Sequence, residues 1–127
     1  MLEAMQKQIA AGAERIVCTG GMSVDPDDCT PWAIMSTGAR VVSYGAPVLP
    51  GAMMLVSYYT NEADGRVIPI LGLPGCVTYA TRTTFDLVLP RVMADDEITA
   101  EDIPKLGEGG LGLNLTVRTL PNCGFGK

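Results

Sequence analysis

Residues 15–23, Arg-Ile-Val-Cys-Thr-Gly-Gly-Met-Ser, and residues 67–75, Val-Ile-Pro-Ile-Leu-Gly-Leu-Pro-Gly, share one pattern. Each is a short apolar run that enters a glycine turn, and each is followed by a helical pattern. In an open α/β sheet such strand-to-helix loops lie at the carboxyl edge, where backbone N–H groups and helix N-termini receive anions and polar rings. Taken alone, Thr-Gly-Gly after a strand is more often a plain turn, but two converging loops favour a ligand. The candidate binding residues are Thr19, Gly20, Gly21 and Ser23 in the first loop and Gly72, Pro74 and Gly75 in the second.

The remaining pattern predicts the other elements of the sheet and its helices. We expect helices over 2–13, 31–36 and 77–93, with Thr30 as the N-cap of the second and Pro90 kinking or shortening the third. A short helix is expected over 99–106. Strands are expected over 40–44, 53–59 and 113–118, although 52–55 also suits a helical turn. Asp64-Gly65 predicts a hairpin turn before the strand at 67–71.

This order predicts an α/β fold, a three-layer α/β/α sandwich with a mostly parallel sheet and a hairpin at one edge. With 127 residues the chain is one domain at most. We expect an α/β domain over 1–94 and a C-terminal extension over 95–127 that packs on it.

Composition limits the partners. The net charge is −5 without a basic stripe, which argues against nucleic acid or an anionic membrane as a partner. Hydrophobic residues make up 47% and charged residues 18% of the chain, so either both sheet faces are covered or apolar surface is kept for a partner. No apolar window is long enough to span a membrane, and the N-terminus lacks a signal pattern, so a cytoplasmic protein is expected.

The cysteines and the absence of histidine argue against a zinc site. Cys18, Cys29, Cys76 and Cys123 include no C-x-x-C pair. They are expected to be small buried hydrophobic residues in a reducing compartment. The alternative is a reactive thiolate at Cys76, at a predicted helix N-terminus.

Three segments together resemble a known family. Residues 18–31, Cys-Thr-Gly-Gly-Met-Ser-Val-Asp-Pro-Asp-Asp-Cys-Thr-Pro, are followed by Pro-Gly-Ala-Met at 50–53 and Gly-Leu-Pro-Gly-Cys at 72–76. In this order they resemble the molybdopterin-binding domain of molybdenum-cofactor biosynthesis proteins, which include molybdopterin adenylyltransferases and molybdenumtransferases. The ending Pro-Asn-Cys-Gly-Phe-Gly-Lys at 121–127 resembles a subgroup described as molybdopterin-binding proteins. The resemblance covers nearly the whole chain. Domains of this family open with a further strand and loop, so the chain is expected to lack that opening strand and to be the C-terminal part of a larger protein or a shortened relative.

The resemblance gives the acidic loop a role. Asp28 matches the aspartate that follows the glycine loop in both transferase branches, and it is the candidate catalytic residue. Asp25 is a further candidate binding residue. A carboxylate here would accept hydrogen bonds from the pterin or hold a cation that bridges nucleotide phosphates. The alternative, stronger for Asp27 than for Asp28, is that these charges only favour the N-terminus of the following helix.

Methionine and tryptophan side chains could either contact the ligand or pack in the core. The methionines at 22, 53, 54 and 93 are expected to fill the core and not to bind molybdenum. Trp32 either stacks on a ring or plugs the space beneath the loop, and the plug is favoured.

The expected ligand is molybdopterin, held with its phosphate at the second loop. If catalysis is complete, Mg²⁺ and ATP or AMP take part, in adenylyl transfer or in molybdate insertion. No protein-bound metal site is expected. The alternative is a non-catalytic molybdopterin carrier or sensor, and a homo-oligomer is expected in either case.

Overall fold

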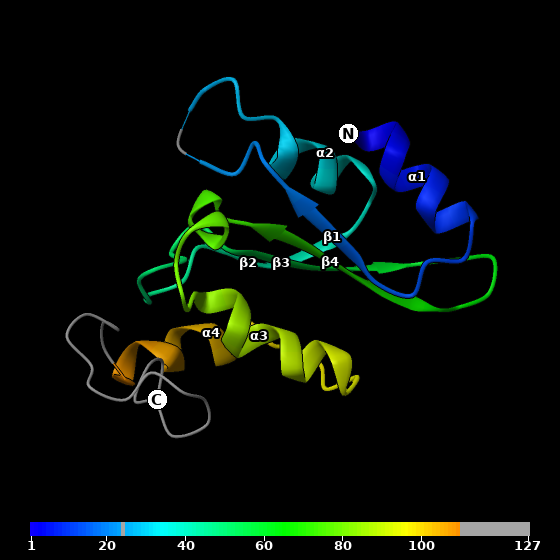
Figure 1. The fold of residues 1–127 in the computed structure, drawn as a ribbon. Helices are drawn as coiled ribbons and strands as arrows, with labels where there is room; N and C mark the ends of the chain where they lie inside the picture. The colour runs from blue at the N-terminus through cyan, green and yellow to red at the C-terminus, as the bar shows by residue number, and fades with distance from the viewer. Residues whose placement is uncertain (24, 110–127) are drawn as a thin grey trace.

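A computed structural model describes residues 1–23 and 25–109 of the chain. A four-stranded sheet lies between two layers of helices (Figure 1). Its strands are β1 (Ile16–Thr19), β2 (Arg40–Tyr44), β3 (Leu55–Thr60) and β4 (Val67–Leu73), in the order β1-β4-β3-β2. β1 pairs parallel with β4, whereas β3 is antiparallel to both β4 and β2. Three strands therefore run in one direction and β3 runs against them, which confirms the α/β class.

The hairpin between β3 and β4 forms at the predicted turn. The Asn61 N–H donates to the Arg66 carbonyl at 2.8 Å, and the Gly65 N–H donates to the Asn61 carbonyl at 2.7 Å. Gly65 has φ +73°, a left-handed conformation that glycine adopts without steric cost. The hairpin lies in the middle of the sheet and not at an edge as predicted, because β2 pairs with the outer side of β3.

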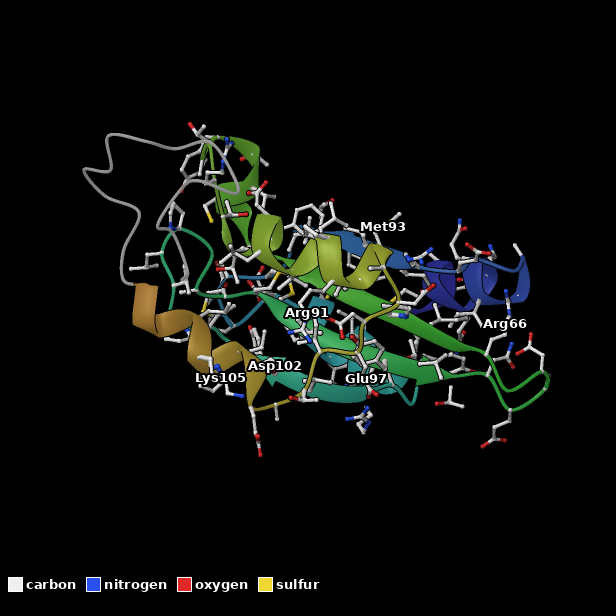
Figure 2. All side chains as sticks on the ribbon, turned by 90° about the horizontal axis from the view of Figure 1, so that it is seen from below. Arg66, Arg91, Met93, Glu97, Asp102 and Lys105 are labelled. Carbon is white, nitrogen blue, oxygen red and sulfur yellow. The ribbon has the colours of Figure 1, made fainter. Side chains whose placement is uncertain are left out.

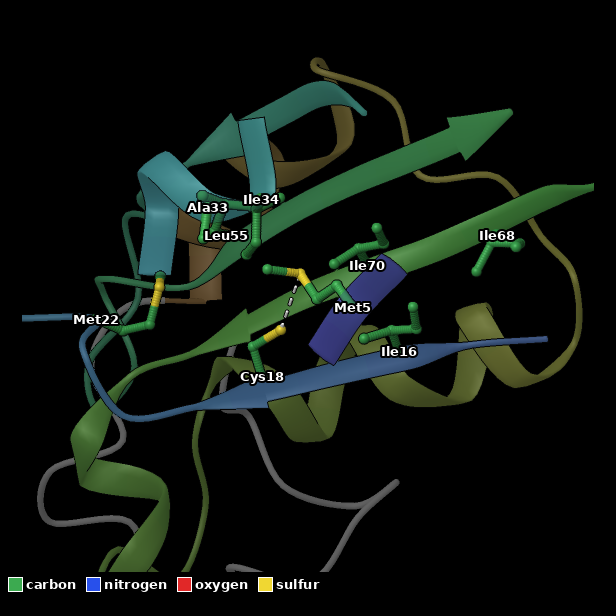
Figure 3. Close-up of a cluster of buried hydrophobic side chains, with 9 residues drawn as sticks. All are labelled: Met5, Ile16, Cys18, Met22, Ala33, Ile34, Leu55, Ile68 and Ile70. Atoms are coloured by element: carbon green, nitrogen blue, oxygen red, sulfur yellow. Dashed lines mark hydrogen bonds between the residues drawn. The ribbon is translucent and has the colours of Figure 1, made fainter. Parts of the chain in front are cut away.

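One face of the sheet is covered by α1 (Leu2–Ala10) and α2 (Thr30–Ser36), as Figure 3 shows for their shared core. α1 ends at Ala10, before the end of the predicted range 2–13, and Gly12 follows it with φ +88°. The buried residues on this face come from both helices, three strands and the first glycine loop: Met5, Ile16, Cys18, Met22, Ala33, Ile34, Leu55, Ile68 and Ile70.

The opposite face packs against α3 (Thr84–Met93) and α4 (Asp102–Lys105), which together complete the three layers. The Ile98 N–H donates to the Tyr58 hydroxyl at 2.8 Å, so the connection between the two helices is attached to the sheet. Arg91 of α3 donates to the carboxylates of Asp96 at 2.7 Å and Asp102 at 3.2 Å (Figure 2). The Thr99 N–H donates to Asp102, and this bond with the Arg91 contact lowers the pKa of the Asp102 carboxyl.

The prediction of one helix over 77–93 was wrong. Residues Gly75–Thr78 form a short 3₁₀ helix, η1, and α3 begins only at Thr84. Thr83 explains the break, because its side chain accepts the Phe85 N–H while Asp86 accepts the Thr83 N–H. This reciprocal capping box fixes a helix start at that point. Pro90 lies inside α3, which continues to Met93.

Three predictions around the helices were also wrong. Cys29, and not Thr30, is the N-cap of α2. Trp32 is 63% exposed and is no plug, because Ala33 and Ile34 occupy the face of α2 that packs on the sheet. Met93 is 56% exposed, whereas Met22 and Met54 are buried as expected.

The short helix expected over 99–106 is shorter in the structure, as α4, and is followed by a second 3₁₀ helix, η2 (Leu106–Gly109). The predicted strand over 113–118 lies outside the described residues. Within the part of the chain that the structure describes, no helix has the length and apolar character needed to cross a membrane.

Candidate ligand site at the carboxyl edge of the sheet

The two glycine loops leave the sheet side by side. Thr19, the last residue of β1, is in register with Leu73, the last residue of β4, and these strands are parallel neighbours. From there β1 continues to α2 on one face, and β4 continues to η1 and α3 on the other. Adjacent parallel strands whose connections diverge to opposite faces form the crevice where ligands of open α/β sheets bind.

The glycines of the first loop are required by its turn. Gly20 and Gly21 have φ +81° and +61°. A Cβ on Gly21 would lie 2.6 Å from the Thr30 hydroxyl oxygen, which donates its own hydrogen to the Gly20 carbonyl at 2.8 Å. Thr30, the first residue of α2, therefore attaches the loop to that helix through this hydrogen bond.

The acidic segment folds back onto that loop. The Ser23 N–H donates to Asp28 Oδ2 at 2.7 Å, and the Asp28 N–H donates to the Asp25 carbonyl at 3.0 Å. Asp25 accepts the Asp27 N–H through Oδ1 at 3.1 Å. The structure thus brings Asp28 and Ser23 together. Asp27 is exposed, and in these contacts only its backbone N–H takes part.

In the second loop the two glycines differ in how closely other atoms approach them. A Cβ on Gly72 would lie 2.7 Å from Met22 Sδ and 3.2 Å from Leu55 Cβ, so this residue is glycine because the core packs closely against it. A Cβ on Gly75 would meet nothing within 4 Å. Among the described residues, the N–H groups of Gly75 and Cys76 donate to no acceptor, and they are the first two residues of η1.

A third loop, residues 45–54, reaches the same edge, because β2 runs in the direction of β1 and β4. The Pro50 carbonyl accepts the Thr84 N–H at 3.1 Å. Gly51 has φ +110°, and a Cβ there would lie 2.6 Å from the Thr84 nitrogen, so the loop is pressed against the start of α3. Sequence reasoning noted residues 50–53 as a family motif but did not place them at the site, since that needs the strand order.

A cleft of about 580 Å³ lies between the three loops. Of the predicted site residues, Ser23, Pro74 and Gly75 line it, whereas Thr19, Gly20, Gly21, Gly72, Asp25 and Asp28 lie outside its lining. Sequence reasoning missed the other residues that line it: Met22, Leu49, Pro50, Gly51, Ala52, Met53, Cys76 and Tyr79. No charged side chain belongs to this described lining.

The cysteines near the loops differ in their surroundings. Cys18 is buried, donates to Met5 Sδ at 3.7 Å, and has its thiol pKa raised by burial, so it stays protonated at neutral pH (Figure 3). Cys29 is exposed, contrary to the expectation of burial, and Cys76 is half-buried at the cleft. Cys123 lies outside the described residues. No group of metal-binding side chains occurs within residues 1–23 and 25–109.

Another hollow, of about 300 Å³, lies beside β2, β3 and the C-terminal end of α3. Its three carboxylates are already engaged: Asp95 with Arg15 at 2.8 Å, Asp96 with Arg91 at 2.7 Å and Glu97 with Arg40 at 2.8 Å. The Glu97 pair connects the residues after α3 to β2, the Asp95 pair connects them to the residue before β1, and the Asp96 pair connects them to α3 itself, so these carboxylates have structural roles.

The sequence model of a family described as "Probable molybdopterin binding domain" matches residues 1–110. The chain belongs to this family. A comparison with curated proteins finds no match. The match spans all three loops around the cleft, so the site at the carboxyl edge lies within the molybdopterin-binding domain.

The residues at the edge suit such a ligand. The described residues of the cleft give a mostly apolar lining without charged side chains for a pterin ring. The N–H groups of Gly75 and Cys76, which have no acceptor among these residues, can donate to an anion. The described residues do not gather a ligand set for Mg²⁺.

Proposed function

We propose that this chain binds molybdopterin, or its adenylated form, across the two glycine loops during assembly of the molybdenum cofactor. The proposal is supported most by one observation: the two loops start in register at Thr19 and Leu73 and then diverge to opposite faces. The family match supplies the class of ligand. The cytoplasmic location expected from the sequence remains part of this proposal.

A transferase reaction is a second candidate, supported by Asp28. Its Oδ2 is held by the Ser23 N–H at the rim of the cleft, and its other oxygen has no donor among the described residues. In adenylyl transfer, the pterin phosphate attacks the α-phosphorus of ATP and pyrophosphate leaves. Molybdate insertion would instead release AMP from the adenylated pterin. Either step needs positioning and charge stabilisation but no covalent nucleophile.

A carrier or sensor without catalysis is the alternative. The cleft favours it, because its described lining residues include no lysine or arginine that could neutralise a triphosphate. Binding of pterin by an apolar cleft and backbone N–H groups needs no such cation.

Anaerobic titration of the purified chain with molybdopterin and, separately, with Mg-ATP tests these proposals. Retention of molybdopterin is expected. Pyrophosphate release with both ligands present would establish the adenylyltransferase, and AMP release from adenylated molybdopterin with molybdate would establish the molybdenumtransferase. Pterin binding without either product would favour the carrier. A chain that is folded by circular dichroism and retains neither form of molybdopterin would refute the proposed function.

A homo-oligomer also belongs to this proposal. Trp32 and Met35 on α2 are 63% and 52% exposed, and their spacing places them on one side of that helix. Two large apolar side chains on one helix surface favour contact with another copy.

A further inference from the structure

The cleft is bordered by two large apolar side chains that face water. Tyr79 is 82% exposed and Leu49 is 48% exposed, and both line the cleft between the loops. They come from different loops, Leu49 from residues 45–54 and Tyr79 from the residues that follow η1. Exposed apolar side chains are common singly on surfaces, but two that border one cleft mark a place where apolar contact is made.

Both side chains stand on backbone that is fixed by hydrogen bonds. The Tyr79 N–H donates to the Cys76 carbonyl at 3.2 Å, and the Thr78 hydroxyl donates to the Gly75 carbonyl at 2.9 Å. Leu49 precedes Pro50, whose carbonyl accepts the Thr84 N–H. The backbone of Tyr79 is thus held to η1, and the backbone next to Leu49 is attached to the start of α3.

The chemistry of the lining selects a flat, neutral group. An aromatic ring that leaves its faces open stacks on heterocycles, and such stacking tolerates any planar ring with a π face. The phosphate cannot be recognised by Tyr79 in this way, but it can accept hydrogen bonds from the N–H groups of Gly75 and Cys76, which have no acceptor among the described residues. The ring and the phosphate of one ligand are thus contacted by different groups of the same cleft.

We infer that Tyr79 stacks on the pterin ring of the bound ligand, with Leu49 in contact with the same ring, so that this pair determines selectivity for the pterin. The inference rests on the proposed function and adds to it the residues that recognise the ring. Tyr79 is a binding residue here and takes no part in group transfer.

Anaerobic binding of molybdopterin and of its dephosphorylated form to three variants tests this inference. Tyr79→Ala is expected to weaken both ligands by about tenfold, since the ring is common to them. Tyr79→Phe keeps the ring face and is expected to bind within about twofold of the unchanged chain. Tyr44→Ala, which removes an exposed tyrosine of β2 outside the cleft, is the control and should leave both affinities unchanged.

A fully oxidised, phosphate-free pterin provides a second readout, because stacking on a tyrosine ring quenches pterin fluorescence. Quenching is expected with the unchanged chain and with Tyr79→Phe, and not with Tyr79→Ala. If Tyr79→Ala binds both molybdopterin forms as tightly as the unchanged chain, the stacking inference is overturned while the proposed function stands. Loss of affinity in Tyr79→Phe as large as in Tyr79→Ala would also overturn it. If the unchanged chain binds neither form, both proposals fail.

Discussion

Asp27 and Asp28 carry the same charge in the same loop, but only the carboxylate of Asp28 contacts the glycine loop, through the Ser23 N–H at 2.7 Å. Asp28→Asn keeps a carbonyl oxygen that accepts this bond and removes the charge. If the chain is a transferase, we expect turnover to fall by roughly 100-fold or more. The melting temperature should change by no more than about 2 °C, because the loop keeps its contact.

Asp27→Asn is the matched control, since it removes one charge from the same loop without touching that contact. Turnover should then remain close to that of the unchanged chain. Equal losses in both variants would show that only the net charge of the loop matters. If Asp28→Asn instead unfolds the domain while each folded molecule keeps its affinity, the residue is structural.

Gly75 is a position where a side chain is sterically free to project into the cleft, because a Cβ would meet nothing within 4 Å. Its backbone is outside the left-handed region, so Gly75→Val should fold normally. The branched side chain would cover the N–H groups of Gly75 and Cys76, and affinity should fall at least tenfold more for phosphorylated molybdopterin than for the dephosphorylated form. Calorimetry with both ligands measures this. Equal losses of affinity for the two ligands would indicate that the phosphate binds at Gly20 and Ser23 instead.

The elements themselves show what sequence alone could establish. The first glycine loop, the hairpin turn at Gly65 and a helix end near Gly12 were predictable, because each depends on a local backbone conformation that glycine favours. The sequence could not show that Leu49 and Tyr79 border one cleft, since this follows from the strand order. Trp32 was misplaced because its burial depends on which side of a short helix meets the sheet.

The break before α3 was missed although its signal is local. Thr83 and Asp86 form a capping box, but the apolar spacing from Val77 onward runs through it and suggested one helix. Where the two signals conflict, the cap determines the start of the helix because it satisfies backbone N–H groups that would otherwise lack partners.

Thr83→Ala tests the importance of this cap. The change removes the side chain that accepts the Phe85 N–H, and we expect a loss of about 1 kcal/mol in the free energy of unfolding. Urea denaturation measures it, with Thr81→Ala as a control at an exposed threonine before the cap. Since the start of α3 also holds the loop at Pro50, molybdopterin affinity should fall slightly in Thr83→Ala. A stability equal to that of the unchanged chain would mean that the Pro50 contact alone fixes the start of α3.

At the scale of the whole molecule, large apolar side chains are exposed on one helix layer and at one edge of the described sheet. The layer of α1 and α2 presents Trp32 and Met35 to solvent. Among the described strands β1 lies at an edge of the sheet, with Val17 47% exposed. Exposed apolar residues beside an open strand edge are features that proteins commonly cover by association.

We therefore expect sedimentation velocity at micromolar concentration to show a homo-oligomer. Trp32→Gln combined with Met35→Lys should shift the chain toward monomer, because both changes remove apolar area from α2 without altering its packed face at Ala33 and Ile34. Met93→Lys on α3 changes an equally exposed methionine of the opposite layer and should leave the sedimentation coefficient unchanged. A monomer in the unchanged chain would refute the prediction, and dissociation by Met93→Lys alone would move the interface to the layer of α3.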